Sequence, residues 1–391
     1  MKMNILLAGL SLCLALSACG GPKPVSPGTW RAVIELPGGE LPVSMQLEQT
    51  GDNWVATFIN GAERVRVPAT TISTEAMTLA LPAFNTRIDA TRDGDGFAGT
   101  LTLVKRGGKQ QMMPFRAEPN NTRRFVASTA EAAISVAGRW EVEFTDDDGD
   151  ESIAVGEFEQ DGNTVQGTFL TPTGDYRFLA GEVDGDRLQL STFDGSHAFL
   201  FSARLVDDEL AGDFWSGTSW HESWSARRNE NASLPDAYSL TQLVGDNFEF
   251  EFPDTRGRTV SFADERFQGK VILVTLAGSW CPNCHDEAAF LSPFYKKYRD
   301  QGLEMVGLMF EHMEDFDDAV RQINAFRDKF EIEYPLLVAG SSDKTSASRT
   351  MKTLDRVYSF PTSVFIDREG KVRRIHTGFT GPGTGQHYQE L

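Results

Sequence analysis

The stretch VILVTLAGSWCPNCHDE (residues 271–287) decides the fold of the C-terminal part of the chain. The apolar run 270–277 is typical of a strand that is buried on both faces of a sheet. Residues 281–302 have the spacing of an amphipathic helix, and Gly302 is a stop signal. The sequence therefore predicts that Cys281 and Cys284 lie where a buried strand gives way to a helix.

Residues further along repeat this alternation of strands and helices. An apolar strand is predicted at 303–310, a helix at 314–330, and a hairpin over 362–379 that turns at 368–370. Alternation of this kind is typical of an α/β domain. We place that domain at residues 244–391.

A Cys-x-x-Cys-His pattern can be a redox dithiol, a haem attachment site or half of a zinc site. Zinc is disfavoured because no second cysteine pair follows and the six histidines have no ligand spacing. Haem is disfavoured because a motif between a central strand and a packed helix leaves no haem pocket for His285. The dithiol remains, with no metal and no cofactor expected.

The predicted position of the two cysteines at the start of a helix affects the reactivity of their thiols. The start of a helix favours a thiolate over a thiol, because backbone N–H groups and the helix dipole face it. We expect Cys281 to be the exposed attacking sulfur and Cys284 to resolve the mixed disulfide, with Trp280 covering the site. His285 could stabilise the Cys281 thiolate or merely occupy the first helical turn, and both readings stay open.

Two segments, VILVTLAGSWCPNC and SFPTSVFIDREGKVRRIHTGFTGPGTG, together resemble the thioredoxin fold, and within it the TlpA/ResA-like family of extracytoplasmic thiol–disulfide oxidoreductases. The resemblance covers roughly residues 244–391. It implies a redox-active disulfide between Cys281 and Cys284. It also implies a cis-proline at Phe360–Pro361, whose backbone binds the substrate chain together with Trp280.

The resemblance also raises the question of a proton acceptor. Thr275 stands where thioredoxin keeps a buried aspartate as the proton acceptor, so that acceptor is missing here. We expect Glu311, which follows the second predicted strand, to accept the proton of Cys284. The alternative is that Glu311 is a solvated loop acid, with Glu314 nearby.

The N-terminus predicts export and lipidation. Residues 1–18 resemble a lipoprotein signal peptide, after which Cys19 would carry acyl chains and residues 19–27 would form a tether. An ordinary secretory signal ending in cysteine is the alternative. The predicted location is the periplasm, anchored to a membrane, the outer rather than the inner one. Cys281 and Cys284 would then be the only thiols of the mature protein.

Two β-rich stretches, 28–118 and 137–228, share turn and strand patterns. Gly28-Thr29-Trp30 matches Gly138-Arg139-Trp140, and further matches follow at offsets of about 110 residues. We predict an internal repeat of two antiparallel barrel or sandwich modules. Linkers are expected at 119–136 and 229–243.

Charge and family together limit the partners. The formal net charge of -19 disfavours nucleic acid. The resemblance implies protein thiol or disulfide substrates, apocytochrome c among the candidates, and a membrane electron donor of the DsbD type. A thiol peroxidase and a non-enzymatic binding lipoprotein with a structural dithiol are the alternatives. The peroxidase motif fails, because Val274 and Gly278 stand where it needs Pro and Thr.

Overall fold

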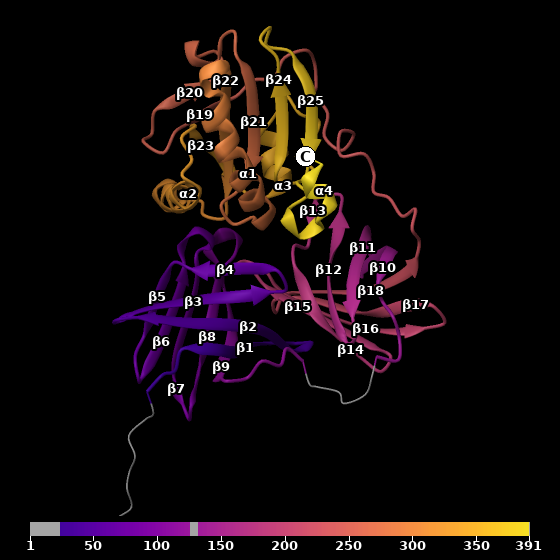
Figure 1. Ribbon diagram of the computed structural model, residues 1–391. Coiled ribbons are helices and arrows are strands. Elements are labelled where there is room, and N and C mark those ends of the chain that lie inside the picture. Colours follow the sequence, from indigo (N-terminus) through magenta and orange to yellow (C-terminus); the bar gives the residue numbers. More distant parts are fainter. Residues whose placement is uncertain (1–23, 126–131, 391) are drawn as a thin grey trace, which may run out of the picture.

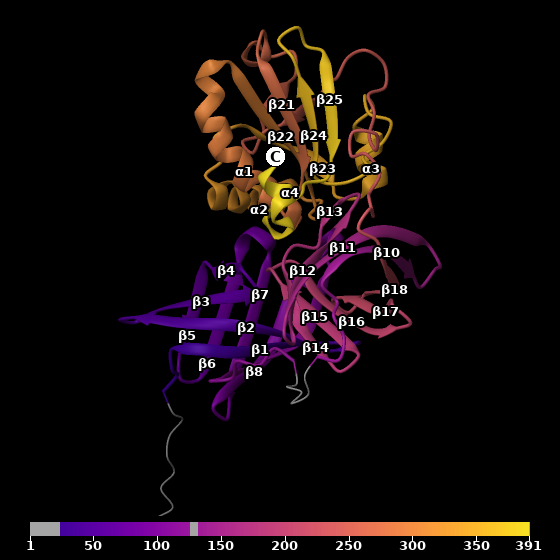
Figure 2. The ribbon, with the colours of Figure 1, turned by 45° about the vertical axis from the view of Figure 1, so that its right-hand side comes forward.

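The computed structural model describes residues 24–125 and 132–390 (Figure 1). The predicted signal peptide and Cys19 lie outside the described residues, as does part of the first linker. The α/β domain rests on two β-modules that lie side by side (Figure 1, Figure 2). Within the described residues, none of the helices has the length and apolar character needed to cross a membrane.

The first module is a nine-stranded antiparallel sheet with the order β4-β3-β2-β1-β9-β8-β7-β6-β5. Its strands are β1 (Gly28–Leu36), β2 (Gly39–Thr50), β3 (Asn53–Asn60), β4 (Glu63–Val67), β5 (Ala69–Ile72), β6 (Ala76–Leu81), β7 (Thr86–Asp93), β8 (Gly96–Val104) and β9 (Gln110–Pro119). The short 3-10 helices η1 (Pro82–Phe84) and η2 (Arg106–Gly108) join strands and contact the α/β domain, η1 through Phe84 on His285 and η2 through the N–H of Gly107, which donates to the carbonyl of His312 at 2.8 Å. The sheet curls into a barrel, and Ala56 of β3 donates to the hydroxyl of Thr70 of β5 at 3.4 Å.

The second module is also a nine-stranded antiparallel barrel, with the order β11-β10-β18-β17-β16-β15-β14-β12-β13 and closure by pairing of β11 with β12. Its strands are β10 (Gly138–Asp146), β11 (Glu151–Asp161), β12 (Thr164–Thr171), β13 (Gly174–Asp175), β14 (Leu179–Asp184), β15 (Arg187–Phe193), β16 (Ala198–Val206), β17 (Glu209–Ser216) and β18 (Trp220–Arg228). Alternate side chains face a core rich in phenylalanine.

The predicted relationship between the modules is visible in matched contacts. Trp30 and Trp140 are both buried at the start of the first strand of their module. Each indole N–H donates to the carbonyl four residues earlier, at 3.1 Å to Ser26 and at 2.9 Å to Val136. Because the same side chain makes the same local bond in both barrels, the structure confirms two antiparallel β-modules of one design.

The α/β domain has a five-stranded mixed sheet with the order β23-β22-β21-β24-β25 and a separate hairpin, β19–β20. Its elements are β19 (Glu251–Pro253), β20 (Thr259–Ser261), β21 (Val271–Ala277), α1 (Pro282–Tyr298), β22 (Leu303–Glu311), α2 (Phe316–Phe330), β23 (Leu336–Ser341), α3 (Lys344–Thr350), β24 (Thr362–Ile366), β25 (Val372–Thr377) and α4 (Gln386–Gln389). The predicted strand, helix and hairpin segments are confirmed. β21 is the central strand, which explains its continuous apolar sequence.

The two modules are packed firmly on each other. Arg124 follows the first module and is buried, and its guanidinium donates to the carbonyl oxygens of Ile59 in β3 and Ser191 in β15 at 3.0 and 2.8 Å. The hydroxyl of Ser191 donates to the carbonyl of Pro42 at 2.6 Å. Phe193 of the second module joins the apolar core of the first. The two modules therefore form one continuous unit that supports the α/β domain.

Candidate active site

The dithiol lies at the beginning of α1, where β21 ends and a short turn leads into the helix. Pro282 is the first helical residue, a position where the missing N–H of proline costs nothing. Cys281 caps the helix, and its Sγ accepts the backbone N–H of Cys284 at 3.3 Å. Both cysteines are free thiols in the structure. The sulfur of Cys281 therefore faces the unpaired N–H groups that favour a thiolate.

Burial of the pair differs from the prediction in one respect. Cys284 is 1% exposed, as expected for a resolving thiol. Cys281 is only 5% exposed, so the expectation of an exposed attacking sulfur is wrong for this structure. The physical reason is that the β-modules cover this end of the α/β domain, for example where the hydroxyl of Ser196 donates to the carbonyl of Trp280 at 2.9 Å.

Burial and the neighbouring sulfur together set the state of Cys284. The pKa of its thiol is raised well above the usual value, first by burial and then by the adjacent Cys281. Cys284 is therefore held as a thiol. This is the state expected of the cysteine that acts second, in resolution.

The loop opposite the dithiol has the predicted cis peptide bond between Phe360 and Pro361. The carbonyl oxygen of Phe360 lies 3.5 Å from the Sγ of Cys281. Trp280 packs edge-on against the Phe360 ring at 5.9 Å, and its indole N–H donates to the carbonyl of Phe310 at 2.8 Å. The structure thus brings Trp280, Phe360 and Pro361 together around Cys281, while their substrate-binding role stays a prediction.

Glu311 is the last residue of β22 and is a buried carboxyl group rather than a solvated one. Its two oxygens accept the backbone N–H and the hydroxyl of Ser279, at 3.0 and 2.6 Å. Burial raises the pKa of Glu311 to about 7. The geometry therefore connects Glu311 to the turn that precedes Cys281, and its predicted role as proton acceptor for Cys284 stays a prediction.

A second buried carboxyl group, Glu287, was missed by the sequence reasoning. It lies one helical turn after Cys284 and accepts the hydroxyl of Ser363 on β24 at 2.7 Å. Burial raises the pKa of Glu287 to about 7, and its charge is one of the influences that raise the pKa of Cys284. Ser363 pairs across the sheet with Thr275, so Glu287 reaches the region where the missing aspartate was expected. The i,i+3 spacing from Cys284 was the signal that could have found it.

The ring nitrogens of His285 contact groups other than the sulfur of Cys281. Its Nε2 lies 2.6 Å from the carbonyl of Ser279, and its Nδ1 accepts from the ammonium of Lys329 at 2.9 Å. Burial and Lys329 lower the pKa of His285 well below its usual value, so the ring is neutral. The ring stacks on Phe84 of the first module at 3.9 Å. Because both nitrogens are engaged, neither is available to a haem iron.

A mixed sheet, a Cys-x-x-Cys pair at the start of the helix after its central strand, and a cis-proline loop beside the first cysteine define a thiol–disulfide site of the thioredoxin class. Residues 244–375 match the AhpC/TSA family. The C-terminal third of the chain is a TlpA/ResA-like domain of the thioredoxin fold.

Several named proteins are similar to this part of the chain. The thiol-disulfide oxidoreductase ResA of Bacillus thuringiensis subsp. konkukian is 28% identical over 123 residues, 32% of this chain and 62% of the relative. The thioredoxin-like protein YneN of Bacillus subtilis is 27% identical over 130 residues, 33% of this chain and 68% of the relative.

A solved structure, a putative thiol:disulfide interchange protein DsbE from Chlorobium tepidum, is 23% identical, with a TM-score of 0.29, and the match covers 38% of this chain and 96% of that one. The chain thus spans 62% of the length of the ResA relative, and the match covers 32% of this chain.

Proposed function

We propose that the protein is an extracytoplasmic thiol–disulfide oxidoreductase that reduces disulfides in other proteins. The observation that carries the proposal is the Cys281 sulfur at the N-cap of α1, 3.3 Å from the Cys284 N–H and 3.5 Å from the Phe360 carbonyl of the cis-proline loop. The names of the ResA relatives support the same activity.

The reaction follows from the positions of the two sulfurs at the start of α1. The Cys281 thiolate attacks one sulfur of a substrate disulfide; that S–S bond breaks, and the other substrate sulfur leaves as a thiolate and takes up a proton. Cys284 then loses its proton and attacks the Cys281 sulfur of the mixed disulfide, releasing the second substrate thiol. The substrate gains two electrons and two protons, and the enzyme is left with a Cys281–Cys284 disulfide that a dithiol donor must reduce.

The resolving step needs a group that takes the proton of Cys284. Glu287 is the nearer candidate in electrostatic terms, because its charge acts on the pKa of Cys284. Glu311 is the second candidate, acting through Ser279 and the turn before Cys281. Both have a pKa of about 7, so each can accept and release a proton near neutral pH.

The finer parts of the proposal concern direction and place. The N-terminal sequence supports export, cleavage before Cys19 and lipid anchoring in the periplasm, with the outer membrane as the destination. Partners would be proteins with cysteine pairs, apocytochrome c among them, and a membrane dithiol donor of the DsbD type. We divide the mature chain into a tether (19–27), the two modules and the catalytic domain (244–391).

The proposal is tested by disulfide turnover. The full chain with Cys13 and Cys19 replaced by serine is supplied with dithiothreitol and insulin, and reduction is followed by turbidity. We expect C281S to abolish turnover, because the nucleophile is lost. Equal turnover by wild type and C281S contradicts the proposal, and consumption of hydrogen peroxide without insulin reduction favours the thiol peroxidase instead.

A further inference from the structure

The surface that surrounds Cys281 on the α/β domain is occupied by the chain's own second module. The occupant is the turn between β12 and β13, residues 171–175, which reaches up from the barrel to the α/β domain (Figure 1). The carbonyl of Thr173 accepts the hydroxyl of Ser359, the residue before the cis Phe360–Pro361 pair, at 3.2 Å. The turn therefore lies directly against the loop that is expected to bind substrate.

The other side of the turn contacts the Cys-x-x-Cys segment itself. The amide of Asn283, between the two cysteines, donates to the carboxylate of Asp175 at 3.4 Å, and the same carboxylate accepts the N–H of Gly381 at 2.6 Å. A Cβ on Gly174 would collide with the amide of Asn283 and lie 3.3 Å from the carbonyl of Phe379. The turn thus fills the space between the dithiol helix and the segment after β25, which we call the groove.

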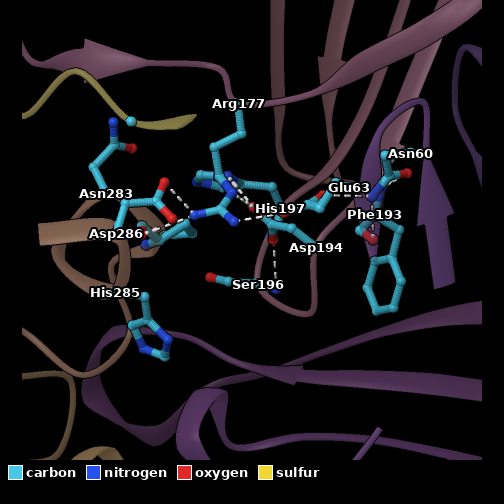
Figure 3. Close-up of polar contacts among 12 residues, drawn as sticks. Asn60, Glu63, Arg177, Phe193, Asp194, Ser196, His197, Asn283, His285 and Asp286 are labelled. Atoms are coloured by element: carbon cyan, nitrogen blue, oxygen red, sulfur yellow. Dashed lines mark hydrogen bonds and ion pairs between the residues drawn. The ribbon is translucent and has the colours of Figure 1, made fainter. Parts of the chain in front are cut away.

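One arginine holds the turn in this groove. Arg177, two residues after the turn, donates to the carboxylate of Asp286 and the carbonyl of Pro282 in the α/β domain, at 2.6 and 3.0 Å. It also donates to Glu63 of the first module at 2.5 Å and lies 3.3 Å from Asp194 of its own module. Figure 3 shows the guanidinium between Asp286 on one side and Glu63 and Asp194 on the other. A single buried guanidinium thus links all three parts of the molecule.

The backbone at Arg177 supports a dedicated role for this residue. Its φ is 58°, in the left-handed region that residues other than glycine rarely adopt. Such a conformation persists only where surrounding contacts over-determine it, and it is common at clamps and switches. The contacts that fix it here are the bond from its own N–H to the Asp175 carboxylate at 2.6 Å and the guanidinium contacts across the domain boundary.

We propose that residues 171–175 occupy the groove that receives the substrate polypeptide, and that Arg177 is the latch that keeps them there. This inference rests on the proposed function, and it identifies the partner by the kind of polypeptide segment that fits the groove. Because the occupant is a tight hairpin turn with a glycine where Asn283 and Phe379 leave no space for a side chain, the partner is a segment with a small residue at that point. The segment must displace the turn before its disulfide reaches Cys281.

The test measures access to Cys281 in the full chain. Cys13, Cys19 and Cys284 are replaced by serine, so that Cys281 is the single thiol, and its alkylation by iodoacetamide is followed by mass spectrometry. We expect R177A to raise the alkylation rate at least about tenfold, which corresponds to about 1.4 kcal/mol in the opening equilibrium. R204A is the matched control, because Arg204 belongs to the same module and pairs with Asp186 on the exposed surface.

A second pair of variants tests the turn with the arginine retained. G174A places a methyl group against Asn283, whereas G185A, also at positive φ in the second module, meets nothing within 4 Å. We expect faster alkylation in G174A and the wild-type rate in G185A. Circular dichroism identifies any variant that fails to fold, and E63Q, which removes one charge from the latch, then replaces R177A with the same expectation.

The outcomes separate the latch from the proposed function. Equal alkylation rates in wild type, R177A and G174A overturn the latch, whatever the insulin assay shows. The insulin assay is run on proteins in which Cys284 is restored. Faster alkylation in R177A, but no insulin reduction by wild type or R177A, supports the latch and contradicts the proposed function. Faster alkylation together with faster insulin reduction supports both.

Discussion

Arg177 of the second β-module and Asp286 of the catalytic domain form a buried ion pair at 2.6 Å, two residues beyond the resolving Cys284. Burial outweighs the attraction of Arg177 and raises the pKa of Asp286 to about 7. Three carboxyl groups share this one guanidinium, so acidic groups outnumber the positive charge of Arg177 where the modules meet the catalytic domain.

The order of attack can be read from trapped intermediates. When C284S is mixed with a disulfide-containing protein, we expect a stable mixed disulfide with Cys281, because the resolving thiol is missing. C281S should trap little, since Cys284 is 1% exposed and its thiol pKa is raised. Non-reducing gels followed by mass spectrometry measure both adducts. A stronger adduct in C281S than in C284S would reverse the assignment of the two cysteines.

The two buried glutamates should differ in kinetic effect. We expect E287Q to slow the resolving step about a hundredfold near pH 7, because general-base catalysis contributes about this much. E311Q should slow it less, since Glu287, unlike Glu311, is among the charges that act on the pKa of Cys284. Stopped-flow measurement of mixed-disulfide decay between pH 5 and 9 provides the test. A larger loss in E311Q would return the proton-acceptor role to Glu311.

Glu287 also predicts how stability depends on pH. Its folded pKa of about 7 lies above the ordinary 4.5, so between these pH values the folded state keeps a proton that the unfolded state has lost. The free energy of unfolding should therefore fall as pH rises from about 4.5 to about 7 and then level off. E287Q should reduce the decrease between pH 5 and pH 8 by on the order of 2 kcal/mol.

Denaturant titrations at the two pH values measure this difference. Glu311 and Asp286 have raised pKa values as well, so part of the decrease should persist in E287Q. An unchanged decrease in the variant would show that Glu287 is not protonated in the folded protein at pH 5.

Arg124 predicts how strongly the two modules depend on each other. Its buried guanidinium donates to the Ile59 and Ser191 carbonyls and to the hydroxyl of Ser191. We expect R124A to lower the free energy of unfolding by about 3 kcal/mol, because buried acceptors lose charged donors. R87A, at an exposed pair with Asp89, should change it by less than about 1 kcal/mol. Similar shifts of the melting temperature in R124A and R87A would contradict the claim that the two modules form one continuous unit.

Much of this molecule could be predicted from local sequence patterns. The strand 271–277, the helix after Cys281 and the repeated Gly-x-Trp of the modules are encoded by residues close in sequence, where periodicity and turn signals are informative. The cis bond at Pro361 was implied by family resemblance and is present.

The cover over Cys281 could not be predicted in this way. It is made by residues more than 100 positions earlier in the chain, and Thr173, Gly174 and Asp175 have the composition of any β-turn. Arg177 likewise has no sequence signal that distinguishes it from a solvated surface arginine. Only the packing of the three parts of the molecule against one another places these residues beside the dithiol.

The most direct test of the account is the equilibrium reduction potential of the Cys281–Cys284 pair, measured in thiol redox buffers on the full chain with Cys13 and Cys19 replaced by serine. We predict a reversible two-electron disulfide with a potential on the order of -250 mV, close to that of thioredoxin, as a reductant requires. A potential near roughly -120 mV would make the protein an oxidant. Failure to form a reversible disulfide would contradict the oxidoreductase account altogether.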